Sequence, residues 1–181
     1  MTERVGKYEI LDKLGEGGNG TVYAVLHPNT GTYRAVKEFK DVSAGEREAK
    51  ILLSLSHPGI PGCLDCFVHD GTYYLIMDYF EGENLWEYKE EKGGGDEEKV
   101  LHSLAELVSY LHSLPVPLIH GDLKPENIII TKEGEVCLLD FGSAFYPNHP
   151  PRKIMGSPGY SAPELKFGRC GTESDVFAFG N

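Results

Sequence analysis

His120-Gly121-Asp122-Leu123-Lys124-Pro125-Glu126-Asn127, followed thirteen residues later by Asp140-Phe141-Gly142, is the stretch that decides how this 181-residue chain folds. In order, it supplies an acid, a lysine, an amide and a second acid around two short hydrophobic runs. Transfer of a phosphoryl group from magnesium-bound ATP needs such a set, because a carboxylate must face the acceptor hydroxyl and oxygen ligands must hold the metal. The pattern therefore predicts phosphoryl-transfer chemistry.

Four side chains of this stretch have predicted roles. Asp122 accepts or orients the proton of the acceptor hydroxyl, and Lys124 neutralises charge on the transferring group. Asn127 binds magnesium, and Asp140 bridges the metal to the phosphates. Each of these residues alone would be an ordinary turn residue, so the prediction depends on the whole set in this order.

Two features nearer the N-terminus fit the same chemistry. Gly15-Glu16-Gly17-Gly18-Asn19-Gly20 matches G-x-G-x-x-G, in which glycines let backbone amides approach phosphates closely. Predicted strands flank it on both sides, which argues against a Rossmann dinucleotide site and favours a hairpin flap over phosphates. Lys37 lies on the third strand, where we expect it to pair with Glu48 and to bind the α- and β-phosphates.

Residues 8–78 predict a five-stranded antiparallel sheet interrupted by one helix. The strands are expected at Tyr8–Leu14, Val22–Leu26, Tyr33–Phe39, Cys63–Val68 and Tyr73–Asp78. Ser43-Ala44-Gly45-Glu46 has the pattern of a capping box and predicts a helix that starts near Ala44. In that helix, an inward face is expected from the spacing of Glu48, Ile51, Leu52 and Leu55.

The composition changes near residue 80. Glu81–Lys99 holds eight acids against three lysines and includes three consecutive glycines. We predict a short helix from Leu85 and a longer one from near Asp96, whose buried face is Val100, Leu104, Leu107, Val108 and Leu111. Short strands at Ile128–Ile130 and Val136–Leu139, an ordered loop over Tyr146–Pro163 and a helix from Thr172 should follow. The expected fold class is α+β, with a sheet lobe over residues 1–80 and a mainly helical lobe over 81–181.

Net charge, hydropathy and cysteine content argue against several classes of function. The net charge of −11, from 28 acids and 17 bases, argues against nucleic-acid and anionic-membrane binding. No apolar run is long enough to span a membrane, and the first residues carry no signal region, so a cytoplasmic location is the expectation. The cysteines are expected to be buried or free thiols without a metal or a disulfide: Cys63, Cys66, Cys137 and Cys170.

With these motifs in place, the chain resembles the serine/threonine branch of the protein-kinase family from about Tyr8 to Asn181. The resemblance rests on the motifs above together with Ser161-Ala162-Pro163-Glu164 and Asp175. It implies a two-lobed kinase-like fold, ATP with Mg²⁺ (or Mn²⁺) as cofactors and a protein substrate that carries Ser or Thr. Lys124 in Asp122-Leu123-Lys124 is the serine/threonine pattern rather than the tyrosine-specific one.

The resemblance also implies an adenine site and three supporting contacts. Met77 would be the gatekeeper, and Asn84 would reach the ribose. The remaining adenine residues would be Val22, Ala35 and Ile129, which enclose the ring, and the hinge Asp78, Tyr79 and Phe80. Ser157 stands where the family usually has a threonine that contacts the catalytic Asp and Lys, and Asp175 would anchor the catalytic loop.

Two departures from the family pattern carry expectations of their own. Gly121 replaces the usual arginine, which normally holds a phosphate on the activation loop, and that loop offers only Ser143 and Tyr146 as acceptors. We therefore predict activity that does not depend on activation-loop phosphorylation, with Arg152 and Lys153 supplying positive charge. The chain also ends within the expected central helix of the large lobe, either as a fragment or as a naturally short form, so a homodimer or a partner is expected to cover the truncated lobe.

Two other functions fit parts of the sequence. A nucleotide-binding scaffold module that is inactive because of truncation would bind ATP without turnover. A small-molecule kinase of the aminoglycoside phosphotransferase type shares His-Gly-Asp in its catalytic loop, although Lys124–Asn127 and Ser161–Glu164 argue against it. The leading prediction is an ATP-dependent serine/threonine protein kinase.

Overall fold

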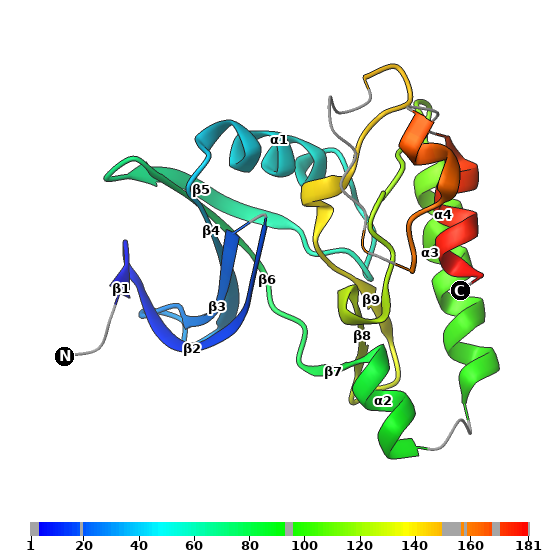
Figure 1. Ribbon diagram of the computed structural model, residues 1–181. Helices are drawn as coiled ribbons and strands as arrows, with labels where there is room; N and C mark the ends of the chain where they lie inside the picture. The colour runs from blue at the N-terminus through cyan, green and yellow to red at the C-terminus, as the bar shows by residue number, and fades with distance from the viewer. Residues whose placement is uncertain are drawn as a thin grey trace. The chain divides into compact units, whose positions relative to one another are not determined.

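Two units make up the chain, Met1–Tyr79 and Phe80–Asn181. The computed structural model describes residues 4–18, 20–92, 96–149, 157, 159–167 and 171–180 (Figure 1). In the first unit, β-branched and aromatic residues alternate between turns, which suits a sheet that buries one face. The result is a six-stranded antiparallel sheet in the order β1-β2-β3-β4-β6-β5.

The five strands predicted from the sequence are confirmed, and the sheet gains one short edge strand. Its strands are β1 (Arg4–Val5), β2 (Tyr8–Gly17), β3 (Gly20–Leu26), β4 (Tyr33–Phe39), β5 (Cys63–His69) and β6 (Thr72–Asp78). The glycine-rich segment is the hairpin end of β2 and β3, where Gly17 pairs with Gly20. One face of the sheet buries a cluster of Val5, Tyr8, Val25, Val36 and Ile76.

Helix α1 (Val42–Leu53) is the predicted helix, but the predicted capping box at Ser43 is wrong. Asp41 is the N-cap: its Oδ1 accepts hydrogen bonds from the Ser43 backbone N at 2.9 Å and the Ser43 hydroxyl at 2.7 Å. These bonds lower the pKa of Asp41. A carboxylate is a stronger acceptor than a hydroxyl, so it takes the cap. Glu46 instead faces solvent, 4.0 Å from Lys50.

The inward face of α1 packs against β4, β5 and β6. Glu48, Ile51 and Leu52 are buried there, as the helical spacing predicted. Leu55 lies beyond the end of the helix and is only partly buried. The helix therefore places one carboxylate, that of Glu48, on the covered face of the sheet.

The second unit combines a small sheet with helices. Its antiparallel strands are β7 (Gly82–Asn84), β8 (Ile128–Thr131) and β9 (Val136–Leu138), and its α-helices are α2 (Leu85–Lys92), α3 (Glu97–His112) and α4 (Thr172–Phe179). Three short 3-10 turns join them: η1 (Pro125–Asn127), η2 (Phe141–Ser143) and η3 (Pro163–Phe167). All five positions predicted for the buried face of α3 are buried.

Strand β7 was not predicted, because a glycine followed by two polar residues carries no hydrophobic alternation. It forms because Gly82 lets the backbone approach β8: a Cβ there would lie 2.2 Å from the Ile130 carbonyl oxygen. Asn84 ends β7 and caps α2, since its Oδ1 accepts from the Glu87 backbone N while the Glu87 carboxylate accepts from the Asn84 N. No helix in the described part of the chain is long and apolar enough to cross a membrane.

Candidate active site

A buried ion pair in the first unit joins β4 to α1. Lys37 Nζ donates to both carboxylate oxygens of Glu48, at 2.9 Å and 2.7 Å. The two side chains are 3% and 1% exposed, so the pair is shielded from water and each charge stabilises the other. Lys37 Nζ also lies 5.0 Å from the centre of the Phe39 ring. The predicted pair is present, held between the sheet and the helix that covers it.

The first glycines of the glycine-rich hairpin face open space where another residue would place its Cβ. A Cβ at Gly15 or Gly17 would meet no atom within 4 Å. Gly20 differs, because it has a φ of 135° and a Cβ there would lie 2.1 Å from the Glu38 carbonyl oxygen. Glu16 pairs with Thr21 across the hairpin, and Asn19 lies outside the described residues. The strands on both sides fit a hairpin flap and not a strand-to-helix Rossmann turn.

Each unit contains part of the set predicted to bind adenine. In the first unit, Val22 is the register partner of Lys37, and Ala35 is the partner of Met77. Asp78 closes β6, and its Oδ2 accepts from the Gly62 backbone N at 3.1 Å. In the second unit, Phe80 precedes β7, and Asn84 is the register partner of Ile129. The Asn84 oxygen is engaged in the cap of α2.

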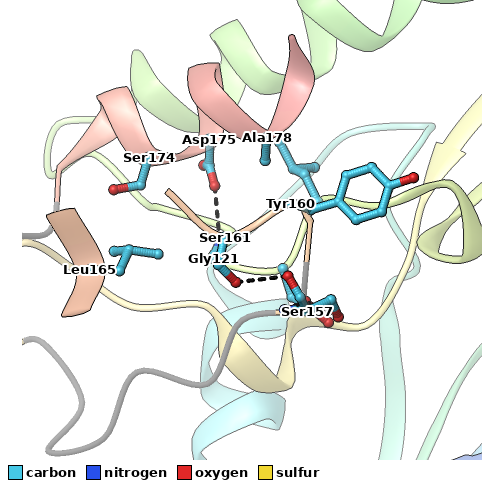
Figure 2. Close-up of a pocket in the computed structure, with 10 residues that line it drawn as sticks. Gly121, Ser157, Tyr160, Ser161, Leu165, Ser174, Asp175 and Ala178 are labelled. Carbon is cyan, nitrogen blue, oxygen red and sulfur yellow. Dashed lines mark hydrogen bonds between the residues drawn. The ribbon is translucent and has the colours of Figure 1, made fainter. Parts of the chain in front are cut away.

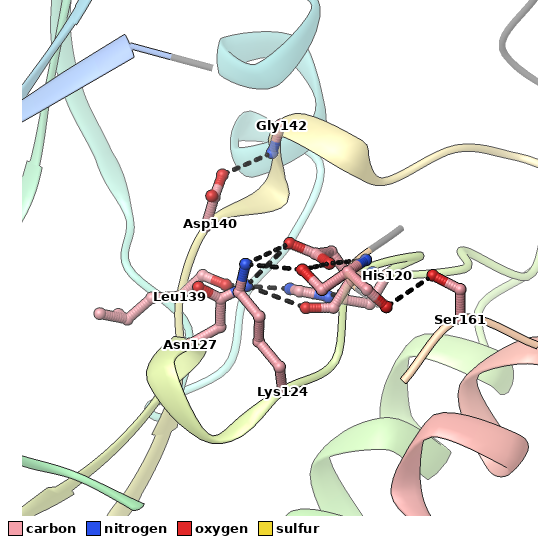
Figure 3. A network of polar contacts seen from close by, with 9 residues as sticks. His120, Lys124, Asn127, Leu139, Asp140, Gly142 and Ser161 are labelled. Carbon is pink, nitrogen blue, oxygen red and sulfur yellow. Dashed lines mark hydrogen bonds and ion pairs between the residues drawn. The ribbon is translucent and has the colours of Figure 1, made fainter. Parts of the chain in front are cut away.

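The segment from His120 to Asn127 forms a tight polar network in the second unit (Figure 3). Asp122 Oδ1 accepts from both the hydroxyl and the backbone N of Ser157, at 2.8 Å and 3.1 Å. Lys124 Nζ lies 2.9 Å from Asp122 Oδ2 and donates to the Ser157 hydroxyl at 2.9 Å. The contact of Ser157 with the acid and the lysine, implied by the resemblance, is therefore present.

Asn127 and Asp140 supply oxygen atoms close to this network. Asn127 Nδ2 donates to the Asp122 carbonyl at 2.8 Å, which turns the amide oxygen away from that carbonyl. The Asn127 carbonyl accepts from the Leu139 N at 2.8 Å, so the chain runs from this contact directly into Asp140. Asp140 has a left-handed backbone with φ 58°, and its Oδ1 accepts from the Gly142 N. Figure 3 shows these residues together.

This donor set fits magnesium. An amide oxygen and a carboxylate are hard ligands, which Mg²⁺ prefers, and Mg²⁺ sites usually take few protein ligands and complete the shell with phosphate and water. Within the described ranges, no group of three or more His, Cys, Asp or Glu could hold a metal ion. Asn127 and Asp140 together offer one amide oxygen and one carboxylate to such a metal.

Helix α4 holds the segment His120–Asn127, which we call the catalytic segment for its predicted role. Asp175, 1% exposed, accepts from the His120 backbone N at 2.8 Å and from the Gly121 backbone N at 2.9 Å. His112 Nε2 lies 3.0 Å from the same carboxylate. Figure 2 shows Asp175 above Gly121, at a small pocket that Ser157 and other side chains line. The anchoring role that the resemblance implied for Asp175 is present in the structure.

His120 has a structural role that the sequence did not indicate. Its side chain is fully buried, its Nε2 lies 2.9 Å from the Leu139 carbonyl oxygen, and its ring meets Phe141 edge-on at 5.0 Å. His120 thus connects the catalytic segment to the segment that carries Asp140. The sequence signal for this role was the position of His120 at the start of the motif His120–Asn127, between an apolar run and Asp122.

Gly121 allows a close approach that no other residue would. Its φ is 77°, and a Cβ there would lie 2.8 Å from the Ser143 carbonyl oxygen. The neighbouring residues Ile119 and Phe145 exchange two backbone hydrogen bonds of 2.9 Å. The chain after Asp140–Gly142 therefore lies directly against the catalytic segment. Arg152 and Lys153, predicted to supply charge in this region, lie outside the described residues.

Comparison with known proteins agrees with this geometry. A family model described as protein kinase domain matches residues 8–181. The chain belongs to the protein kinase family.

Three of the relatives that it matches are named as serine/threonine-protein kinases. The chain is 31% identical over 196 residues to the RAC family serine/threonine-protein kinase homolog of Dictyostelium discoideum, covering 99% of this chain and 44% of that protein. It is 31% identical to the mouse (Mus musculus) kinase Nek1, over 96% of this chain and 16% of Nek1. It is 31% identical to PrkC of Bacillus subtilis, over 97% of this chain and 29% of PrkC. The chain thus spans less than half the length of these kinases.

Proposed function

We propose that this chain transfers the γ-phosphoryl group of ATP to serine or threonine hydroxyls of a protein. The observation that carries the proposal is the arrangement at Asp122, where Lys124 and Ser157 contact one carboxylate on a loop anchored by buried hydrogen bonds. The family and its serine/threonine relatives support the same activity. The proposed acceptor is a protein, because the relatives are named as protein kinases.

The proposed roles follow from the position of each side chain. Asp122 orients the acceptor hydroxyl and takes its proton, while Lys124 balances negative charge on the group in transfer. Asn127 and Asp140 would hold Mg²⁺, which, when bound, neutralises phosphate charge. In the first unit, Lys37, oriented by Glu48, binds the α- and β-phosphates. Catalysis then depends mainly on positioning and on fixed charges.

The remaining proposed residues bind the nucleotide. Backbone amides of the glycine-rich hairpin cover the phosphates, and the residues predicted for adenine and ribose keep those roles in the proposal. ATP is therefore the proposed cofactor, with Mg²⁺ or Mn²⁺. Since Asn84 Oδ1 caps α2, its remaining side-chain group for the ribose is the amide Nδ2.

Phosphate transfer from γ-labelled ATP tests the proposal. The chain and its Asp122→Asn variant are incubated with magnesium, and the chain itself and a basic general protein serve as acceptors. Because a positioned proton acceptor contributes about 10²–10⁴-fold, we expect the variant to lose at least a hundredfold in rate. Glu106→Gln, the same change on an exposed face of α3, should retain full activity.

Other outcomes of this assay would contradict the proposal. A folded chain that binds ATP without transferring phosphate would indicate a nucleotide-binding scaffold. Transfer to small alcohols such as aminoglycosides, with none to proteins, would indicate a small-molecule kinase. An Asp122→Asn variant as active as the unsubstituted chain would remove Asp122 from the proposed mechanism.

Activity should not require phosphorylation of the segment after Asp140–Gly142. The Cβ of an arginine in place of Gly121 would meet the Ser143 carbonyl, so the usual phosphate-holding side chain has no room there. We expect the double variant Ser143→Ala/Tyr146→Phe to keep the transfer rate of the unsubstituted chain. The rate is measured on protein treated with phosphatase, with thermal unfolding as a check on the fold. A folded but inactive double variant would contradict this prediction.

A further inference from the structure

Helix α1 comes unusually close to the sheet at one residue, Gly45. A Cβ at this position would lie 2.3 Å from Cδ1 and 2.8 Å from Cγ of Tyr73 on β6. Both distances are far below ordinary van der Waals contact, which begins near 3.4 Å. The predicted capping-box pattern included Gly45 but gave it no role. Its buried position shows that the absent side chain is what lets the helix lie against the tyrosine ring.

The Tyr73 ring cannot turn aside easily. The clash would fall on Cδ1 and also on Cγ, and rotation of the ring about the Cβ–Cγ bond leaves Cγ in place. Tyr73 is 6% exposed, and Phe39 packs against it edge-on at 6.1 Å between ring centres. Burial raises the pKa of Tyr73, and Cys66 adds to the shift. The helix, and not the ring, would have to move.

The contact lies beside the Lys37–Glu48 pair. Gly45 and Glu48 are three residues apart on α1, so they share its buried face. Phe39, which packs on Tyr73, also lies next to Lys37 Nζ. A helix pushed outward at Gly45 would carry the Glu48 carboxylate away from Lys37. Relief of the clash needs a shift of about 1 Å, and a misplacement of that size can cost about 10²-fold in rate.

We propose that Gly45 is a positioning residue, whose missing side chain lets α1 approach Tyr73 closely enough for Glu48 to reach Lys37. This inference rests on the proposed function for its effect on catalysis, but not for its effect on the ion pair. The proposal predicts the opposite of the usual result for a helix. Alanine in place of an interior glycine normally stabilises the protein, whereas Gly45→Ala should destabilise it.

Gly45→Ala tests the inference with three measurements. We expect the thermal midpoint to fall and kcat/KM for ATP to fall about tenfold or more. We also expect Lys37 to react at least several times faster with an acylating reagent such as sulfo-NHS-acetate, which peptide mass spectrometry follows. The last readout reports the pair directly, because a paired and buried ammonium reacts slowly. It remains valid if the unsubstituted chain transfers no phosphate, a result that would contradict the proposed function alone.

Two further variants separate positioning from simple loss of stability. Lys50→Gly, at an exposed position of the same helix, should lower the thermal midpoint and leave Lys37 labelling and kcat/KM for ATP unchanged. Tyr73→Ala removes the ring, so adding Gly45→Ala to it should have much less effect than in the unsubstituted chain. If Gly45→Ala alone does not fold, recovery of folding in the double variant supports the inference.

Either of two results would overturn it. One is a Gly45→Ala variant with a raised thermal midpoint and unchanged Lys37 labelling, as for an ordinary helix glycine. The other is an effect of Gly45→Ala that is the same with and without the Tyr73 ring.

Discussion

Replacing Lys37 with methionine is expected to lower the free energy of unfolding by about 3–5 kcal/mol. The Glu48 carboxylate is 1% exposed, and Lys37 donates to both of its oxygens. Methionine keeps most of the volume of lysine but removes the cation, so a carboxylate stays buried without the charge that compensates it. Urea unfolding, followed by circular dichroism, measures the change.

The structure supplies a matched control for this prediction. Lys50 also faces a glutamate, Glu46, but that pair is 4.0 Å apart with side chains 77% and 53% exposed. Lys50→Met should therefore change stability by less than about 1 kcal/mol. Removing both buried charges, with Lys37→Met and Glu48→Leu together, should restore much of the loss, because no charge is left without a partner. Equal effects at Lys37 and Lys50 would contradict the prediction.

Asp175→Ala has the second largest expected effect on stability among the substitutions considered, a loss of about 2–5 kcal/mol in the free energy of unfolding. The variant removes the acceptor of two backbone N–H groups, the buried one of His120 and the partly buried one of Gly121, and leaves both donors without this acceptor. The Asp122 carboxylate follows directly in the chain, so phosphate transfer should fall as well.

Amide hydrogen exchange at His120 and Gly121 provides the measurement specific to this anchor. Exchange at both amides should become faster in Asp175→Ala, while amides in the middle of α3 should change only as far as global stability changes. Glu173→Ala, at an exposed position of the same helix, should leave exchange at His120 and Gly121 unchanged. Unaltered protection at these two amides in Asp175→Ala would show that the anchor has little energetic weight.

Local periodicity accounts for the parts of the fold that the sequence predicts well. The buried face of α3 repeats at helical spacing from Val100 to Leu111, and the strands of the first unit alternate between clear turns. The helix cap was predicted at the wrong residue because two polar residues compete there, and the Asp41 carboxylate is the better acceptor. Strand β7 depends on pairing with β8, which no pattern within Gly82–Asn84 reveals.

The candidate site also has some features that the sequence predicts and others that it does not. The set Asp122, Lys124, Asn127 and Asp140 is readable because phosphoryl transfer needs these groups and their spacing along the chain matches a known signature. The contacts of Ser157 with Asp122 and Lys124 join residues 35 and 33 positions apart, and only the family resemblance indicated them. The close approach of Gly45 to Tyr73 has no sequence signal, since a glycine early in a helix is as typical of a cap as of a packing contact.

The Asp175 anchor also orders events in time while the chain is being made. The backbone N of His120 and the carboxylate that accepts from it are 55 residues apart. At a synthesis rate of about 5–20 residues per second, the acceptor is added about 3–11 s after the donor. Within that interval the catalytic segment can form its contacts with Leu139 once that residue has been added, but not those with α4. A ribosome that pauses between Asn127 and Asp175 would therefore hold a nascent chain whose catalytic segment is complete in sequence and still unanchored.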